Sequence, residues 1–87
     1  MPNYRLHLIN AQIDCDDAEG QDLPSLDEAR AKAIEGIRGV LGDELSHGTI
    51  DLRGRVLIED SRGAVLMTIP FAEAVSIRLP DELPAPD

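Results

Sequence analysis

The sequence of 87 residues has few aromatic, basic and sulfur-containing side chains. Tyr4 and Phe71 are its only Phe, Tyr or Trp residues, so the core must be largely aliphatic, and stacking platforms for single-stranded nucleic acid are absent. The single cysteine, Cys15, excludes an intramolecular disulfide and a cysteine-based zinc site. Its flanking residues, Asp14 and Asp16, disfavour a reactive thiolate.

Basic residues are outnumbered by acidic ones, 8 against 17, which gives a net charge of −9. Because phosphate affinity comes from clustered Lys and Arg, binding to nucleic acid or to an anionic membrane is not expected. The acidity instead favours solubility or a basic protein partner. No apolar run approaches the ~20 residues that span a bilayer, and no signal segment opens the chain, so we expect a cytoplasmic protein.

Hydrophobic residues make up 43% of the chain, which is typical of a globular protein. The length predicts one small domain, residues 1–79. Three prolines and three acidic residues within residues 80–87 predict a flexible tail.

A long helix is predicted from Ser25 to Gly48. Ser25 and Glu28 have the spacing of a capping box, and glycine at position 48 suits a helix end. One side of the helix is apolar, formed by Leu26, Ala29, Ala33, Ile34, Ile37, Val40, Leu41 and Leu45. Gly36, Gly39 and Gly42 weaken the second half, which leaves open whether the helix ends near Gly42.

Arg30 projects from the middle of this apolar side. Its stem is expected to cover the edge of the core while its guanidinium reaches a carboxylate or carbonyl. The alternative is that Arg30 forms an anion or partner site.

Alternating hydrophobicity predicts strands on both sides of the helix. The predicted strands are residues 4–9, 12–16, 55–59 and 64–69, with a turn at residues 60–63 joining the last two. Residues 71–75 fit one helical turn, and the alternative for this segment is a fifth short strand over residues 75–79. The order β-β-α-β-β predicts an α+β two-layer sandwich, with one long helix on a mostly antiparallel sheet of four or five strands.

The predicted strands divide their side chains between two faces. The helix would cover Tyr4, Leu6, Leu8, Ile13, Val56, Ile58, Val65, Met67 and Ile69. The other face would carry Arg5, His7, Ile9, Arg55, Leu57, Ala64, Leu66 and Thr68. Ile9, Leu57 and Leu66 are more aliphatic surface than a solvated face needs, so we predict an interface there, with His7 and Arg55 beside them. A homo-oligomer, most simply a two-fold dimer, is the expected result.

Motifs that would indicate chemistry are weak or absent. The acidic cluster from Asp14 to Asp22 does not fit a calcium loop, because Gly20 falls one position late, so a solvated loop is favoured. Structural roles suffice for His7 and His47. No nucleophile motif, phosphate-binding glycine loop or zinc-protease pattern occurs. We therefore expect no cofactor and no metal, and the sequence does not support an enzyme.

Several segments together resemble a known family. They are residues 4–8, 17–20, 23–26, 29–30, 60–66, 68–71 and 74–75. Over residues 4–77 the chain resembles a family of short, uncharacterised alphaproteobacterial proteins. The resemblance implies a bacterial origin and a compact domain, and no activity. Arg5 stands where an aromatic residue is expected and Cys15 is also unexpected, so the first hairpin should differ in detail from the family.

Three hypotheses for function follow. The leading one is a non-enzymatic cytoplasmic module that associates with protein through its open sheet face or sheet edge. The second is a regulator whose acidic surface binds a basic protein, because the strand hairpin before a Ser-capped helix is also similar to small antitoxin-like domains. The third is a small-ligand or metal-binding domain using His7, His47 and the acidic loop.

Overall fold

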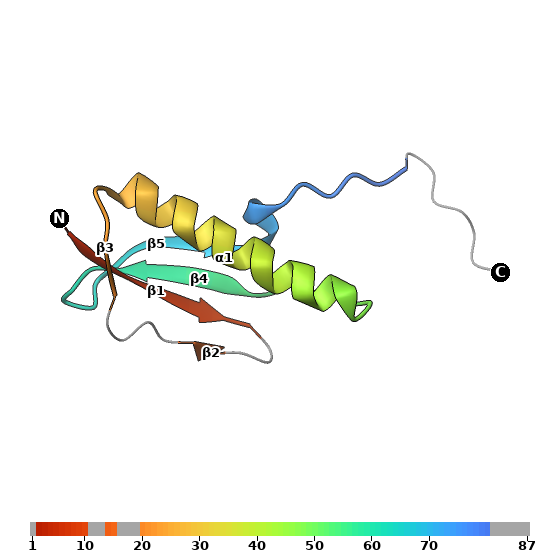
Figure 1. The fold of residues 1–87 in the computed structure, drawn as a ribbon, viewed down its shortest axis with the longest axis horizontal. Helices are drawn as coiled ribbons and strands as arrows, with labels where there is room; N and C mark the ends of the chain where they lie inside the picture. The colour runs from red at the N-terminus through yellow and green to blue at the C-terminus, as the bar shows by residue number, and fades with distance from the viewer. Residues whose placement is uncertain (1, 11–13, 16–19, 81–87) are drawn as a thin grey trace.

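A computed structural model describes residues 2–10, 14–15 and 20–80, with residues 14–15 described through their backbone. One helix, α1 (Leu26–Ser46), lies across one face of an antiparallel sheet (Figure 1). The strands are β1 (Asn3–Ile9), β2 (Asp14–Cys15), β3 (Gln21–Asp22), β4 (Arg55–Glu59) and β5 (Val65–Pro70), and a 3-10 turn, η1 (Phe71–Ala74), follows β5. The predicted two-layer α+β fold is confirmed.

The sheet has the order β2-β1-β4-β5, and β3 pairs with the start of β1. All the pairings are antiparallel. The prediction of a loop after residue 16 is therefore wrong at residues 21–22, which form a strand. Gln21 and Asp22 are both exposed, so backbone pairing forms β3 without the apolar alternation that would reveal it. The predicted strand over residues 12–16 is present at residues 14–15, and its other residues lie outside the described part.

Local signals define both ends of α1. The Ser25 Oγ atom accepts a hydrogen bond from the Glu28 backbone N–H at 3.3 Å. After the helix, Gly48 has a φ of +89°, and its N–H donates to the Leu45 carbonyl at 2.9 Å. The helix continues through Gly36, Gly39 and Gly42 without a break, because its opposite side is anchored by packing. The buried residues on that side are Ala29, Ala33, Ile37 and Leu41.

The last turns of α1 extend past the ends of the strands (Figure 1). A helix of 21 residues is about 31 Å long, whereas the five residues of β4 span only about 17 Å. Leu45, on the predicted apolar side, is consequently 60% exposed. The overhang leaves a hydrophobic residue without a strand beneath it.

The core lies between α1 and the sheet and includes both aromatic residues. Phe71 is fully buried and belongs to η1, so residues 71–74 form the predicted helical turn. Residues 75–80 are not a strand, which settles the alternative for this segment. The buried core residues are Tyr4, Ala29, Ala33, Ile37, Leu41, Val56, Ile58, Ile69, Phe71 and Ala74.

A shift of register in β5 changes which face one residue occupies. Ile58 is opposite Met67, but the next residue, Glu59, is opposite Val65, so the pairing skips Leu66. Directly opposed residues share a face, and Val65 therefore lies on the face of Glu59 and not in the core. The prediction that α1 covers Val65 is wrong, and Val65 is 53% exposed.

Candidate functional site

The face of the sheet that α1 does not cover is organised in three rows across β1, β4 and β5. The first row is Arg5, Glu59 and Val65, the second is His7, Leu57 and Thr68, and the third is Ile9, Arg55 and Pro70. We call these residues, with Leu66, the open face. Leu57 occupies its centre, in the middle of β4.

Aliphatic side chains on the open face are only partly shielded. Leu57 and Ile9 are half-buried, whereas Val65 and Leu66 are 53% and 44% exposed. Among the predicted interface residues, the pairing places His7, Ile9, Arg55 and Leu57 on one face, and Leu66 is exposed at the register shift beside them. Val65 is an additional member that alternation alone assigned to the core.

Charges on the open face lie at its two ends. Arg5 and Glu59 are directly opposite one another in the first row, and Arg55 lies in the third row. The Nε atom of Arg5 is buried and has no hydrogen-bond partner in the described part of the chain. Along β4, the side chains on the open face are therefore a cation, Arg55, then Leu57, then an anion, Glu59.

Arg30 belongs to a different surface. Its Nη2 atom lies 4.0 Å from the Glu73 Oε2 atom in η1, with the two side chains 43% and 55% exposed. Eight residues further along α1, the Arg38 Nε atom donates to the Ala74 carbonyl at 2.7 Å. Arg38 thus connects η1 to the helix, and the Arg30 guanidinium lies near a carboxylate, as the structural alternative for Arg30 expects. The partner or anion site at Arg30 stays a prediction.

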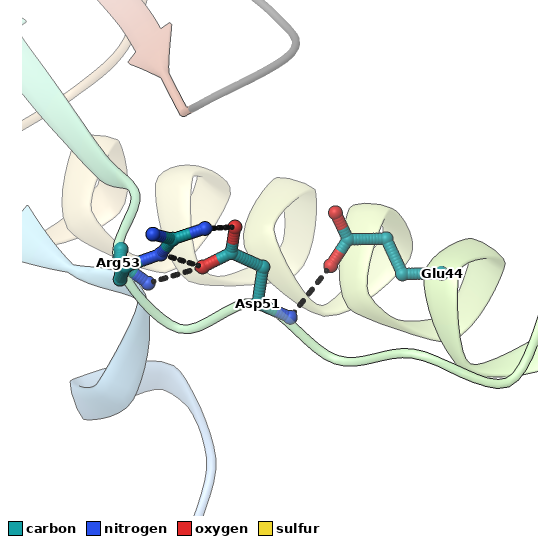
Figure 2. A network of polar contacts seen from close by, with 3 residues as sticks. All are labelled: Glu44, Asp51 and Arg53. Atoms are coloured by element: carbon teal, nitrogen blue, oxygen red, sulfur yellow. Dashed lines mark hydrogen bonds and ion pairs between the residues drawn. The ribbon is translucent and has the colours of Figure 1, made fainter.

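A polar network joins the end of α1 to the connection before β4 (Figure 2). The Arg53 Nε and Nη2 atoms donate to the two carboxylate oxygens of Asp51, each at 2.9 Å, and the Arg53 backbone N–H donates to the same carboxylate at 3.0 Å. The Asp51 backbone N–H in turn donates to the Glu44 Oε1 atom at 3.2 Å. The sequence alone did not predict this network, although an acid two residues before an arginine was a signal for it.

The hydrogen bonds from Arg53 lower the pKa of Asp51 to about 2, and the Asp51 carboxylate raises the pKa of Arg53. Both groups therefore stay charged at neutral pH and satisfy one another, which is unsuited to general acid–base catalysis. They line a surface hollow together with Asp43, Glu44, His47 and Thr49. The arrangement stabilises the connection that leads into β4.

The two histidines lie in separate parts of the fold. His7 is on the open face, whereas His47 caps α1, with its Nδ1 atom 2.9 Å from the Asp43 carbonyl oxygen. Within residues 2–10 and 20–80, no cluster of three His, Cys, Asp or Glu side chains could hold a metal ion. Most of the acidic cluster proposed for the metal alternative lies outside the described residues.

A second apolar surface surrounds the overhanging end of α1. Leu45, Ile50, Ile77 and Leu79 are each at least 44% exposed there. A shallow groove between the helix and residues 75–77 includes the first three of these side chains. This surface depends on the helix overhang and on the path of the chain after η1, neither of which the sequence predicted in detail.

Comparison with known proteins identifies a family and no characterised relative. The family model of a domain of unknown function, DUF6894, matches residues 3–72. No curated protein and no solved structure matches the chain. The match confirms the predicted uncharacterised family, while the alphaproteobacterial origin stays a prediction. No helix in the described part of the chain is long and apolar enough to cross a membrane.

Proposed function

The chain belongs to the DUF6894 family, and we propose that it is a non-enzymatic, cytoplasmic association module whose open face binds a second copy of the chain. The observation that carries this proposal is the aliphatic group at the centre and hairpin end of the open face. Leu57 is only half-buried, and Val65 and Leu66 remain exposed on the side away from α1. Contiguous apolar surface of this kind is typical of an interaction site.

The second copy is favoured over an unrelated partner because the open face carries its own complement. It has a leucine at its centre, a cation on one side along β4 and an anion on the other. Two chains that each carry a net charge of −9 repel one another overall, so their association requires locally opposed charges. The open face supplies them.

The test is the oligomeric state of the purified chain at micromolar concentration, measured by sedimentation velocity. We expect a dimer, and we expect Leu66→Asp to shift it toward monomer because the substitution places a charge in a desolvated contact. Leu45→Asp is the matched control, since Leu45 is also an exposed leucine but lies on the overhang of α1. Far-UV circular dichroism verifies that both variants fold.

Two results would overturn the proposal. The first is a wild-type chain that stays monomeric throughout the micromolar range. The second is a dimer that Leu45→Asp disrupts and Leu66→Asp does not, because this places the contact on the overhang.

The antitoxin-like alternative also has a specific observation in its favour. Asp27, Glu28 and Glu35 are exposed on α1, away from the buried helix side. Such a surface suits a basic protein, whose binding would weaken as salt screens the charges. A pull-down from the native host with wild-type chain and with a Glu28→Gln/Glu35→Gln variant tests it. Salt-sensitive capture of a basic protein by the wild type alone would favour this alternative.

A further inference from the structure

We propose that the two copies stack their open faces about a two-fold axis that crosses the strands at Leu57, which pairs Arg55 of each copy with the partner's Glu59. This inference rests on the proposed self-association and adds its geometry. The rows of the open face decide between the possible axes.

Arg55 and Glu59 are four residues apart on β4, a separation of about 13 Å, and Leu57 lies midway between them. A two-fold rotation about the second row exchanges the first and third rows. Arg55 then faces the partner's Glu59, and Leu57 faces the partner's Leu57. Two ion pairs flank one apolar contact, and all three come from a single strand.

The flanking strands are also compatible with this axis. On β5 the exposed Val65 faces the partner's Pro70, so two apolar side chains meet. On β1 Ile9 faces the partner's Arg5, whose methylene stem offers apolar surface. Stacked sheets are about 10 Å apart, a distance that an arginine and a glutamate side chain together can bridge.

An axis along β4 gives the opposite result. Each row would then face the same row of the partner, with Arg55 against the partner's Arg55 and Glu59 against the partner's Glu59. Like charges in direct opposition are unfavourable, and here both charged positions of β4 would repel. Charge complementarity therefore selects the axis that crosses the strands.

The experiment is a charge exchange measured by sedimentation equilibrium. Arg55→Glu alone and Glu59→Arg alone each turn two attractive pairs into two repulsive ones, so we expect the Kd for dimerisation to rise about tenfold or more. The double variant Arg55→Glu/Glu59→Arg restores opposite charges and should dimerise nearly as well as the wild type. An equimolar mixture of the two single variants should form heterodimers for the same reason.

Matched control variants separate the effect of these ion pairs on the Kd from the effect of a change in net charge. Lys32→Glu and Glu35→Arg change the net charge by the same amounts on the exposed side of α1 and should leave the Kd within about twofold. Circular dichroism verifies the folding of every variant.

The outcomes distinguish the arrangement from the association itself. The arrangement is supported if each single variant dimerises more weakly than the wild type and the double variant recovers the wild-type Kd. A dimer that Leu66→Asp disrupts but the single charge variants do not would overturn the axis while the association stands. Single variants that weaken the dimer without rescue by the double variant would also overturn it. A monomeric wild type would overturn both.

Discussion

Substitution of alanine for glycine should change the free energy of unfolding in opposite directions at two positions of this chain, Gly54 and Gly39. Gly54, immediately before β4, is buried where the end of β1 approaches η1. A Cβ atom there would lie 2.6 Å from the Phe71 Cε2 atom, 2.8 Å from the Asn10 Cβ atom and 2.8 Å from the Ile9 carbonyl oxygen. Phe71 cannot move aside easily, because it is fully buried and its N–H donates to the Gly54 carbonyl at 2.9 Å.

Gly39 lies in the middle of α1, and a Cβ atom there would meet nothing within 4 Å. Alanine at this position removes backbone freedom from the unfolded chain and restores helix propensity. We expect Gly39→Ala to raise the free energy of unfolding by up to about 1 kcal/mol. Gly54→Ala should lower it by about 1–3 kcal/mol, which is the usual cost of forcing an extra methyl group into a packed core.

The assay is urea and thermal unfolding followed by far-UV circular dichroism, at one fixed protein concentration because dimerisation adds stability. For a domain of this size, 1 kcal/mol corresponds to a change in Tm of about 4–8 °C. Gly48→Ala is the control for backbone strain without a clash, since Gly48 has a φ of +89° and open space around it. A neutral or stabilising Gly54→Ala would refute the close packing of β1, Gly54 and η1, and a destabilising Gly39→Ala would refute the open side of α1.

Two further predictions concern the polar contacts. Arg53 lowers the pKa of Asp51 to about 2 from an ordinary value of 3.8. The stability that the ionised Asp51 contributes through this pair is therefore complete above about pH 3.8 and is lost as the pH falls toward 2. In Arg53→Met the pKa of Asp51 should rise toward 3.8, and the loss of stability at low pH should be smaller. Carboxyl-carbon NMR titration measures this pKa, with Arg62→Met as the control. An unchanged pKa of Asp51 in Arg53→Met would contradict the pairing. Arg38→Met should lower the free energy of unfolding by about 1 kcal/mol and speed amide exchange in η1, because it removes the hydrogen bond to the Ala74 carbonyl. Arg30→Met should cost less than about 0.5 kcal/mol, since its ion pair is long and exposed; equal losses for the two arginines would count against this account of η1.

The sequence predicts those parts of the fold whose signals are local. Ser25 fixes the start of α1 through its own side chain, and Gly48 ends it through a backbone conformation that suits glycine. The turn between β4 and β5 is similar, because the Asp60 Oδ1 atom accepts hydrogen bonds from the Arg62 and Ala64 backbone N–H groups. Each of these signals lies within a few residues of the structure that it specifies.

Features that depend on distant parts of the chain escaped prediction. The short strand β3 has two exposed polar residues, and only its backbone pairing with β1 makes it a strand. The residues of β5 alternate in the same way with or without a register shift, so Val65 was assigned to the core. Seven of the ten residues of the open face were therefore predicted, namely Arg5, His7, Ile9, Arg55, Leu57, Leu66 and Thr68. Glu59, Val65 and Pro70 were not.

The register shift in β5 also bears on which surface of the sheet is available for association. β5 is an edge strand, and an edge with unpaired backbone groups is itself a place where another chain can add. Here the irregularity at Leu66 interrupts the edge, and Pro70 at its end has no N–H to donate. Both features disfavour extension of the sheet through β5. The same irregularity places Val65 on the open face, so the structure that protects this edge enlarges the apolar surface of the face. This supports face-to-face stacking over edge pairing through β5 as the mode of the proposed association.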